Sequence, residues 1–72
     1  MSREFHVVIE QDEDGYFVSS VPELPGCHTQ AKSLDQLMVR IREAIALHVE
    51  DMPAGEHPTL EFVGVQRVTI DA

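Results

Sequence analysis

The chain has 72 residues and a mass of 8.1 kDa, and its 13 acidic against 5 basic side chains give a formal charge of −8 at pH 7. This length allows one small domain, which we expect to span residues 1–72 without a C-terminal DNA-binding domain. The excess of carboxylates argues against direct DNA binding, because phosphate backbones are bound through Lys and Arg. No apolar run approaches the roughly 20 residues of a membrane span, so we expect no membrane partner.

Cysteine content and the N-terminus indicate where the protein is found and how it is stabilised. Cys27 is the single cysteine, and residues 1–6 lack the basic-then-apolar layout of a signal peptide. We therefore expect a cytoplasmic protein in which Cys27 is a buried small side chain. A domain of this size buries only about 60% of its unfolded surface. Because no disulfide stabilises it, we expect a homodimer or higher homo-oligomer.

The first half of the chain predicts a β-hairpin. In residues 5–10 the apolar side chains of Phe5, Val7 and Ile9 recur at every second position, which is typical of a strand. Asp14-Gly15 is a strong turn dipeptide, because Gly15 accepts a positive φ without steric cost. Residues 16–21 are aromatic and β-branched and predict the returning strand.

The predicted register of this hairpin assigns the two faces of the sheet. A four-residue connection, residues 12–15, pairs Gln11 with Tyr16. One face then carries Phe5, Val7, Ile9, Tyr16 and Val18, and the other carries His6, Val8, Phe17 and Val21. Because one helix covers only one face, the second face needs another cover. We therefore expect the oligomer interface to include Val8, Phe17 and Val21.

A loop, a short strand and a helix follow the hairpin. Pro22, Pro25 and Gly26 predict a rigid loop, since proline cannot donate to a strand ladder. Residues 27–31 are compatible with a third strand. Ser33 and Gln36 have the spacing of a capping box, in which the Ser33 hydroxyl accepts from the backbone N–H of Gln36. Helical periodicity continues through residue 48 and cannot pass Pro53, so the predicted helix has about four turns.

The C-terminal residues 60–70 are β-rich and predict a fourth strand. A right-handed crossover through the helix brings this strand parallel to the first one. The expected fold is therefore α+β, β-β-β-α-β, with a mixed four-stranded sheet of order 3-2-1-4 and one helix on one face.

Catalytic and metal-binding patterns are absent from the sequence. No Cys-x-x-Cys or His-x-x-x-His pair, phosphate-binding glycine loop or nucleophile motif occurs. We therefore expect no metal, cofactor or catalytic residue. The histidines are scattered over four segments, as His6, His28, His48 and His57.

Residues 14–30, DGYFVSSVPELPGCHTQ, resemble the HicB antitoxins and their small stand-alone relatives. The shared elements are the D-G-Y-x-V strand, the P-x-L-P-G loop, the C-x-T-Q strand and a capped helix ending in REAI, and they cover about residues 7–51. This resemblance implies a shortened, partly degraded RNase H-like fold. It also implies a function, which is to bind a small basic HicA-type toxin that cuts messenger RNA and to cover its active surface.

Two features of the chain bear on that hypothesis. An acidic module suits a basic, RNA-binding toxin electrostatically, since complementary charge speeds and selects the encounter. We expect the partner contacts in the acidic turn and the following loop, at Asp12, Glu13, Asp14, Glu23 and Leu24. The alternatives are a residual metal-dependent nuclease on the same scaffold and an orphan protein-binding module without a toxin.

Overall fold

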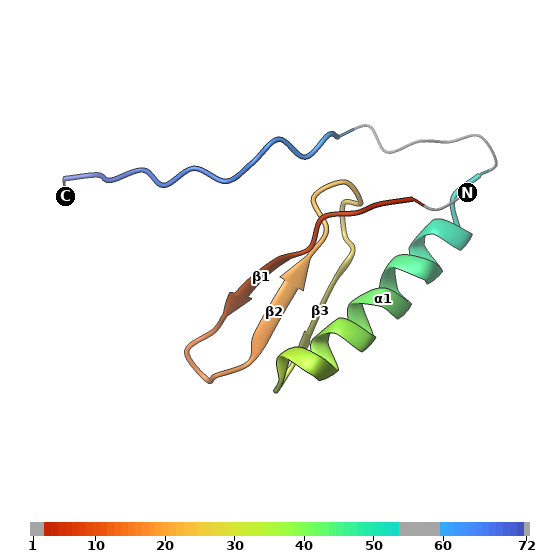
Figure 1. Cartoon of the computed structure of the whole chain (residues 1–72), viewed down its shortest axis with the longest axis horizontal. Helices are drawn as coiled ribbons and strands as arrows, with labels where there is room; N and C mark the ends of the chain where they lie inside the picture. The colour runs from red at the N-terminus through yellow and green to blue at the C-terminus, as the bar shows by residue number, and fades with distance from the viewer. Residues whose placement is uncertain (1–2, 54–59, 72) are drawn as a thin grey trace.

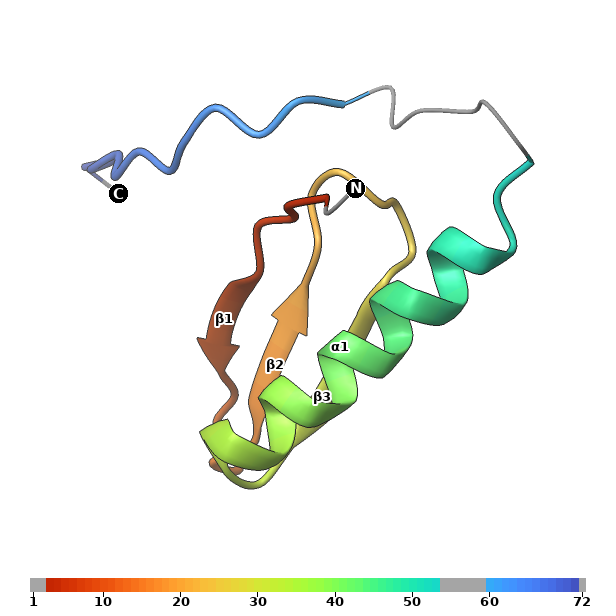
Figure 2. The same ribbon diagram turned by 45° about the vertical axis from the view of Figure 1, so that its right-hand side comes forward.

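The computed structural model describes residues 3–53 and 60–71 (Figure 1). Strands β1 (Val8–Gln11), β2 (Phe17–Ser20) and β3 (His28–Ala31) form an antiparallel sheet of order β1-β2-β3. Helix α1 (Leu34–Glu50) crosses one face of this sheet, over β3 and β2 (Figure 2). The predicted α+β class and the order of the first three strands are therefore confirmed.

The hairpin register differs by one residue from the prediction. Gln11 is paired with Phe17 and Ile9 with Ser19, whereas the sequence predicted a pairing of Gln11 with Tyr16. The reason is a three-residue loop: the Asp12 N–H donates to the Tyr16 carbonyl (2.9 Å), and the Gly15 N–H donates to the Asp12 carbonyl (3.1 Å). Gly15 adopts φ +87°, the left-handed conformation that ends such a loop.

The corrected register changes which side chains lie on each face. The face beneath α1 carries Ser19 and Ala31, both with no exposed surface, together with half-buried Phe17. The predicted partition of the apolar side chains between the two faces is therefore wrong for the second strand. Apart from Val8 and Val18, the ladder positions on the uncovered face are polar: Glu10, Ser20, His28 and Gln30. An antiparallel sheet can leave such a face in water.

The loop between β2 and β3 folds into the core. Leu24 donates its N–H to the Val21 carbonyl (3.0 Å), and Cys27 donates to the Leu24 carbonyl (2.9 Å). Gly26 adopts φ +86°, as the third position of a type II turn after Pro25 requires. Val21, Leu24 and Cys27 thereby pack against Ile41 of α1 and form the centre of the hydrophobic core.

Helix α1 begins where its capping residue predicts. Ser33 has an extended conformation, and its hydroxyl accepts from the Gln36 N–H at 3.2 Å. The helix buries Leu37 and Ile41 completely against the sheet and ends before Pro53, as predicted.

The predicted fourth strand does not form in this structure. Residues 60–71, which we call the tail, are extended and carry no strand, and they run away from the sheet and helix (Figures 1 and 2). The sheet of the described residues therefore has three strands. Of the predicted strand order 3-2-1-4, it contains the 3-2-1 part and lacks the fourth strand.

Candidate partner-binding surface

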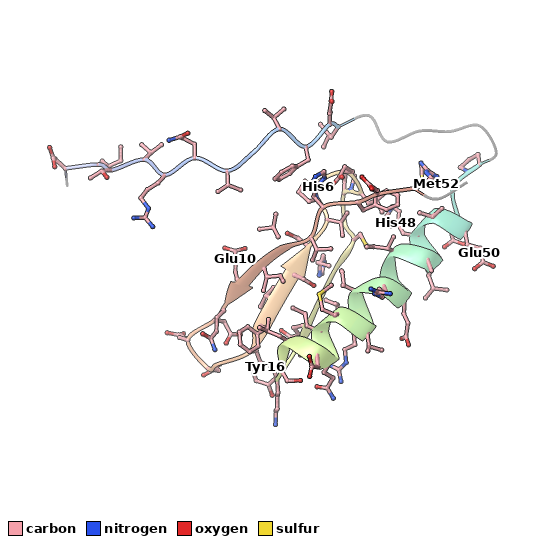
Figure 3. The ribbon with its side chains drawn as sticks, in the orientation of Figure 1. His6, Glu10, Tyr16, His48, Glu50 and Met52 are labelled. Atoms are coloured by element: carbon pink, nitrogen blue, oxygen red, sulfur yellow. The ribbon has the colours of Figure 1, made fainter. Side chains whose placement is uncertain are left out.

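The tip of the β1–β2 hairpin carries an exposed group of carboxylates. Asp12 serves the turn itself, because its Oδ1 accepts from the N–H groups of Asp14 (2.9 Å) and Tyr16 (3.0 Å). Glu13 and Asp14 are exposed, and no hydrogen bond or ion pair within residues 3–53 and 60–71 involves their side chains. Glu10 adds an exposed carboxylate on the preceding strand, above the hairpin end marked by Tyr16 (Figure 3). Glu10, Glu13 and Asp14 are thus exposed carboxylates at or next to the β1–β2 turn, and we call these three residues the acidic tip.

Glu23 is held inside the molecule by His6. Only 8% of Glu23 is exposed, and its two carboxylate oxygens accept from the backbone N–H of His6 at 3.0 and 3.3 Å. The Nδ1 atom of the His6 ring lies 2.9 Å from Glu23 Oε2. Burial by itself raises the pKa of Glu23, but the hydrogen bonds from His6 and the Glu23 backbone and the charge of His6 lower the pKa below its ordinary value of 4.5.

His6 connects Glu23 of the loop with a third segment of the chain, the tail. The ring of Phe62, in the tail, stacks on the ring of His6 with centroids 4.3 Å apart and an interplanar angle of 18°. His6 therefore lies between the loop, the start of β1 and the start of the tail (Figure 3). No sequence pattern indicates this junction, because His6 and Glu23 are 17 residues apart and neither belongs to a motif with the other.

The expected partner contacts are thus divided between the surface and the interior. Glu13 and Asp14 are exposed, as a contact requires, and Asp12 is exposed but organises the turn. Leu24 is only 2% exposed and Glu23 is paired with His6, so both hold the loop in place. The oligomer-interface residues are divided in the same way.

Val8 alone among those three interface residues lies on the uncovered face. Val21 is 2% exposed and belongs to the core. Phe17 is half-buried on the side of the sheet covered by α1, because it is paired with the fully buried Ala31. The one-residue shift of the hairpin register is the reason for both differences.

A groove of about 530 Å³ opens between the N-terminal segment and α1. Its apolar lining comes from Phe5 and Val7 on one side and from Met38, Ile41 and Ile45 on the other. The groove exists because α1 packs over β3 and β2 and does not reach across β1. The charged side chains of Arg3, Glu4 and Arg42 also line it.

The described residues offer no assembled reactive centre. Within residues 3–53 and 60–71, no group of three or more His, Cys, Asp or Glu side chains is placed to hold a metal ion, and His57 lies outside these residues. Cys27 is buried as predicted, and burial raises the pKa of its thiol, which disfavours the reactive thiolate. None of the helices in this part of the chain is long and apolar enough to cross a membrane.

Comparison with known proteins assigns the family. The family model described as "HicB_like antitoxin of bacterial toxin-antitoxin system" matches residues 5–68. The chain belongs to the HicB-like antitoxin family. The match includes the hairpin, the buried loop, α1 and most of the tail. It confirms the family that the motifs of residues 14–30 indicated, and it extends over nearly the whole chain.

Curated relatives of similar length support this assignment. A UPF0150 protein of Archaeoglobus fulgidus is 59% identical over 66 residues, which cover 92% of this chain and 93% of the relative. A second UPF0150 protein, from Synechocystis, is 43% identical over 68 residues, covering 94% of this chain and 96% of its own. A third, from Thermoplasma acidophilum, is 46% identical over 48 residues, covering 67% and 70% of the two chains.

Proposed function

We propose that this HicB-like protein is an antitoxin that binds a small, basic, HicA-type toxin and covers its RNA-binding and active surface. The observation that carries the proposal is the family match over residues 5–68. Its chemistry is binding without catalysis, on a scaffold that we infer to be a shortened relative of the RNase H fold. The formal charge of −8 supports a basic protein partner, since opposite charge accelerates association and selects among partners.

The acidic tip of the hairpin is the contact surface that the geometry favours. Glu10, Glu13 and Asp14 are exposed at one end of the sheet, where a partner can approach without displacing α1. Asp12 contributes indirectly, because its carboxylate fixes the turn that presents Glu13 and Asp14. A rigid turn loses little conformational freedom on binding, which favours affinity.

Co-expression with the neighbouring reading frame tests the proposal. We expect that frame to encode a short basic protein that arrests growth when produced alone. Co-expression with this chain should restore growth, and the two proteins should purify as a complex. A neighbour that is harmless, or one that this chain neither binds nor silences, overturns the toxin proposal and leaves the orphan binding module.

Charge reversal at the tip tests the proposed contact surface. The double variant Glu13→Lys, Asp14→Lys should weaken the complex and make its formation less sensitive to salt. The matched control is Glu43→Lys, Glu50→Lys, which makes the same charge change at exposed positions of α1 and should bind nearly as the wild type does. Equal weakening by both variants would show that net charge, and not the tip, drives binding.

An activity assay separates the binding role from residual catalysis. Purified protein incubated with RNA and Mg²⁺ or Mn²⁺ should leave the RNA intact. Turnover that disappears with Glu10→Gln or Glu43→Gln would instead identify a metal-dependent nuclease.

A further inference from the structure

The tail carries half of the exposed large apolar side chains among the described residues. Its large apolar side chains are from 56% to 93% exposed, as Leu60, Val63, Val65, Val68 and Ile70. Residues 63–70 are rich in β-branched side chains, which favour strands, yet no strand pairs with them in this structure. An extended segment with unpaired backbone groups and such side chains is a surface that another strand edge completes.

The two outer edges of the sheet, β1 and β3, differ in whether their outward backbone groups are open to another strand. The Val21 N–H donates to the Cys27 carbonyl, and the Asp12 N–H donates to the Tyr16 carbonyl. In an antiparallel pair, residues that bond to the neighbouring strand alternate with residues whose backbone groups point away from it, so these two bonds tell which residues of β1 and β3 point away from β2. On β3, the backbone of Gln30 faces outward by this alternation, and its carbonyl is taken by Arg40 Nη1 at 2.8 Å. The side chain of Arg40 therefore obstructs the β3 edge.

The edge of β1 is the vacant one. By the same alternation, Val8 and Glu10 bond to β2, while the backbone groups of Ile9 and Gln11 face outward. Among the described residues, β1 pairs with β2 alone. The groove is lined by residues 3–7, which lead into β1, and by α1, so a strand that pairs with β1 and continues along these residues would lay side chains over the groove.

The tail of the same chain does not occupy this edge. Phe62 is stacked on His6, two residues before β1, so the tail begins beside the start of β1. From there it runs away from the body instead of along β1 (Figures 1 and 2). Each chain therefore presents both an unpaired extended segment and an unpaired sheet edge, and a twofold exchange between two copies would pair both.

We propose that residues 63–70 of the tail form a strand on the β1 edge of a second copy of this chain, and that the second copy returns its tail in the same way. An eight-residue strand of about 26 Å spans β1 and the extended residues before it. The exchange gives both sheets a fourth strand and covers the groove with side chains of the partner's tail. This inference does not depend on the antitoxin role.

Light scattering on wild type and variants tests the exchange. The wild type should have twice the 8.1 kDa mass of one chain at micromolar concentration. Val65→Lys, Val68→Lys should weaken the dimer by about tenfold or more, because two lysines would enter the shared sheet. The matched control, Val39→Lys, Leu47→Lys, alters exposed apolar residues of α1 outside the groove and should keep the wild-type mass.

Two substitutions at Ile9 test whether the β1 edge pairs with the tail. Ile9→Pro removes an outward N–H, whereas Ile9→Ala shortens the side chain and keeps that N–H. Dimer loss with proline and a retained dimer with alanine, both with a wild-type circular dichroism spectrum, support the exchange. A monomeric wild type overturns the exchange. This holds also if the Ile9 and Gln11 amides of that monomer resist hydrogen exchange, since the tail has then folded onto its own β1. A dimer unaffected by both the lysine pair and Ile9→Pro also overturns it, since another face then holds it together.

Discussion

Replacing Leu24 by alanine separates a core role from a contact role for the buried loop. Leu24 is 2% exposed and packs with Val21, Cys27 and Ile41, so truncation leaves a cavity in the centre of the core. Large-to-small changes of this kind cost about 3 kcal/mol, the sum of lost transfer energy and an incompletely closed cavity. In a domain of this size, that loss lowers Tm by roughly 10–20 °C.

Urea or thermal unfolding at one fixed protein concentration measures this loss, since self-association would make stability depend on concentration. The control Leu47→Ala alters an exposed side chain, 64% accessible, and should change stability by no more than about 0.5 kcal/mol. Ile41→Val provides a milder variant, with an expected loss of about 1 kcal/mol, if Leu24→Ala does not fold. A Leu24→Ala protein as stable as the wild type but weaker in toxin binding would refute the core role of Leu24.

Individual contacts lead to three more predictions. Because folding lowers the pKa of Glu23, the native state binds fewer protons at this carboxyl; its stabilisation is complete above the ordinary value of 4.5 and is lost as pH falls through the lowered pKa. Acid titration of stability should therefore show a shallower decline below that pH in Glu23→Gln than in wild type, and identical declines would contradict the His6–Glu23 pairing. Ser33→Ala should cost about 1 kcal/mol in urea unfolding, because the Gln36 N–H loses its acceptor, whereas an unchanged midpoint would show that the cap is dispensable. Cys27 should react with a thiol reagent only at the rate of unfolding, since its thiol is buried and its pKa raised; rapid labelling of the native protein would contradict its burial.

Local signals in the sequence were sufficient for most elements. Gly15 adopts the positive φ that its turn predicts, Gly26 lies in the predicted rigid loop, and Ser33 caps the helix that begins at Leu34. Each of these depends on a few neighbouring residues, because the conformational preference of glycine or the reach of a serine hydroxyl acts within one turn. The helix-facing stripe through Leu37 and Ile41 is likewise a periodicity of one segment.

Pairing between segments was not determined by these local signals. The hairpin register depended on whether the loop contains three or four residues, and the Asp12 carboxylate and its backbone settled that choice through bonds visible only in the folded turn. A shift of one residue moved Phe17 to the opposite face, since side chains alternate along a strand.

The sequence by itself thus determined the local parts of this protein: a hairpin turn, a rigid loop, a capped helix and a strongly acidic composition. The tertiary structure alone decided that Glu23 is an internal anchor for His6 and that the strand-forming tail finds no partner within the described chain. The physical reason is the sequence distance over which each interaction acts. Propensity and capping act over a few bonds, whereas ion pairs and strand edges join residues whose separation in sequence gives no sign of their contact.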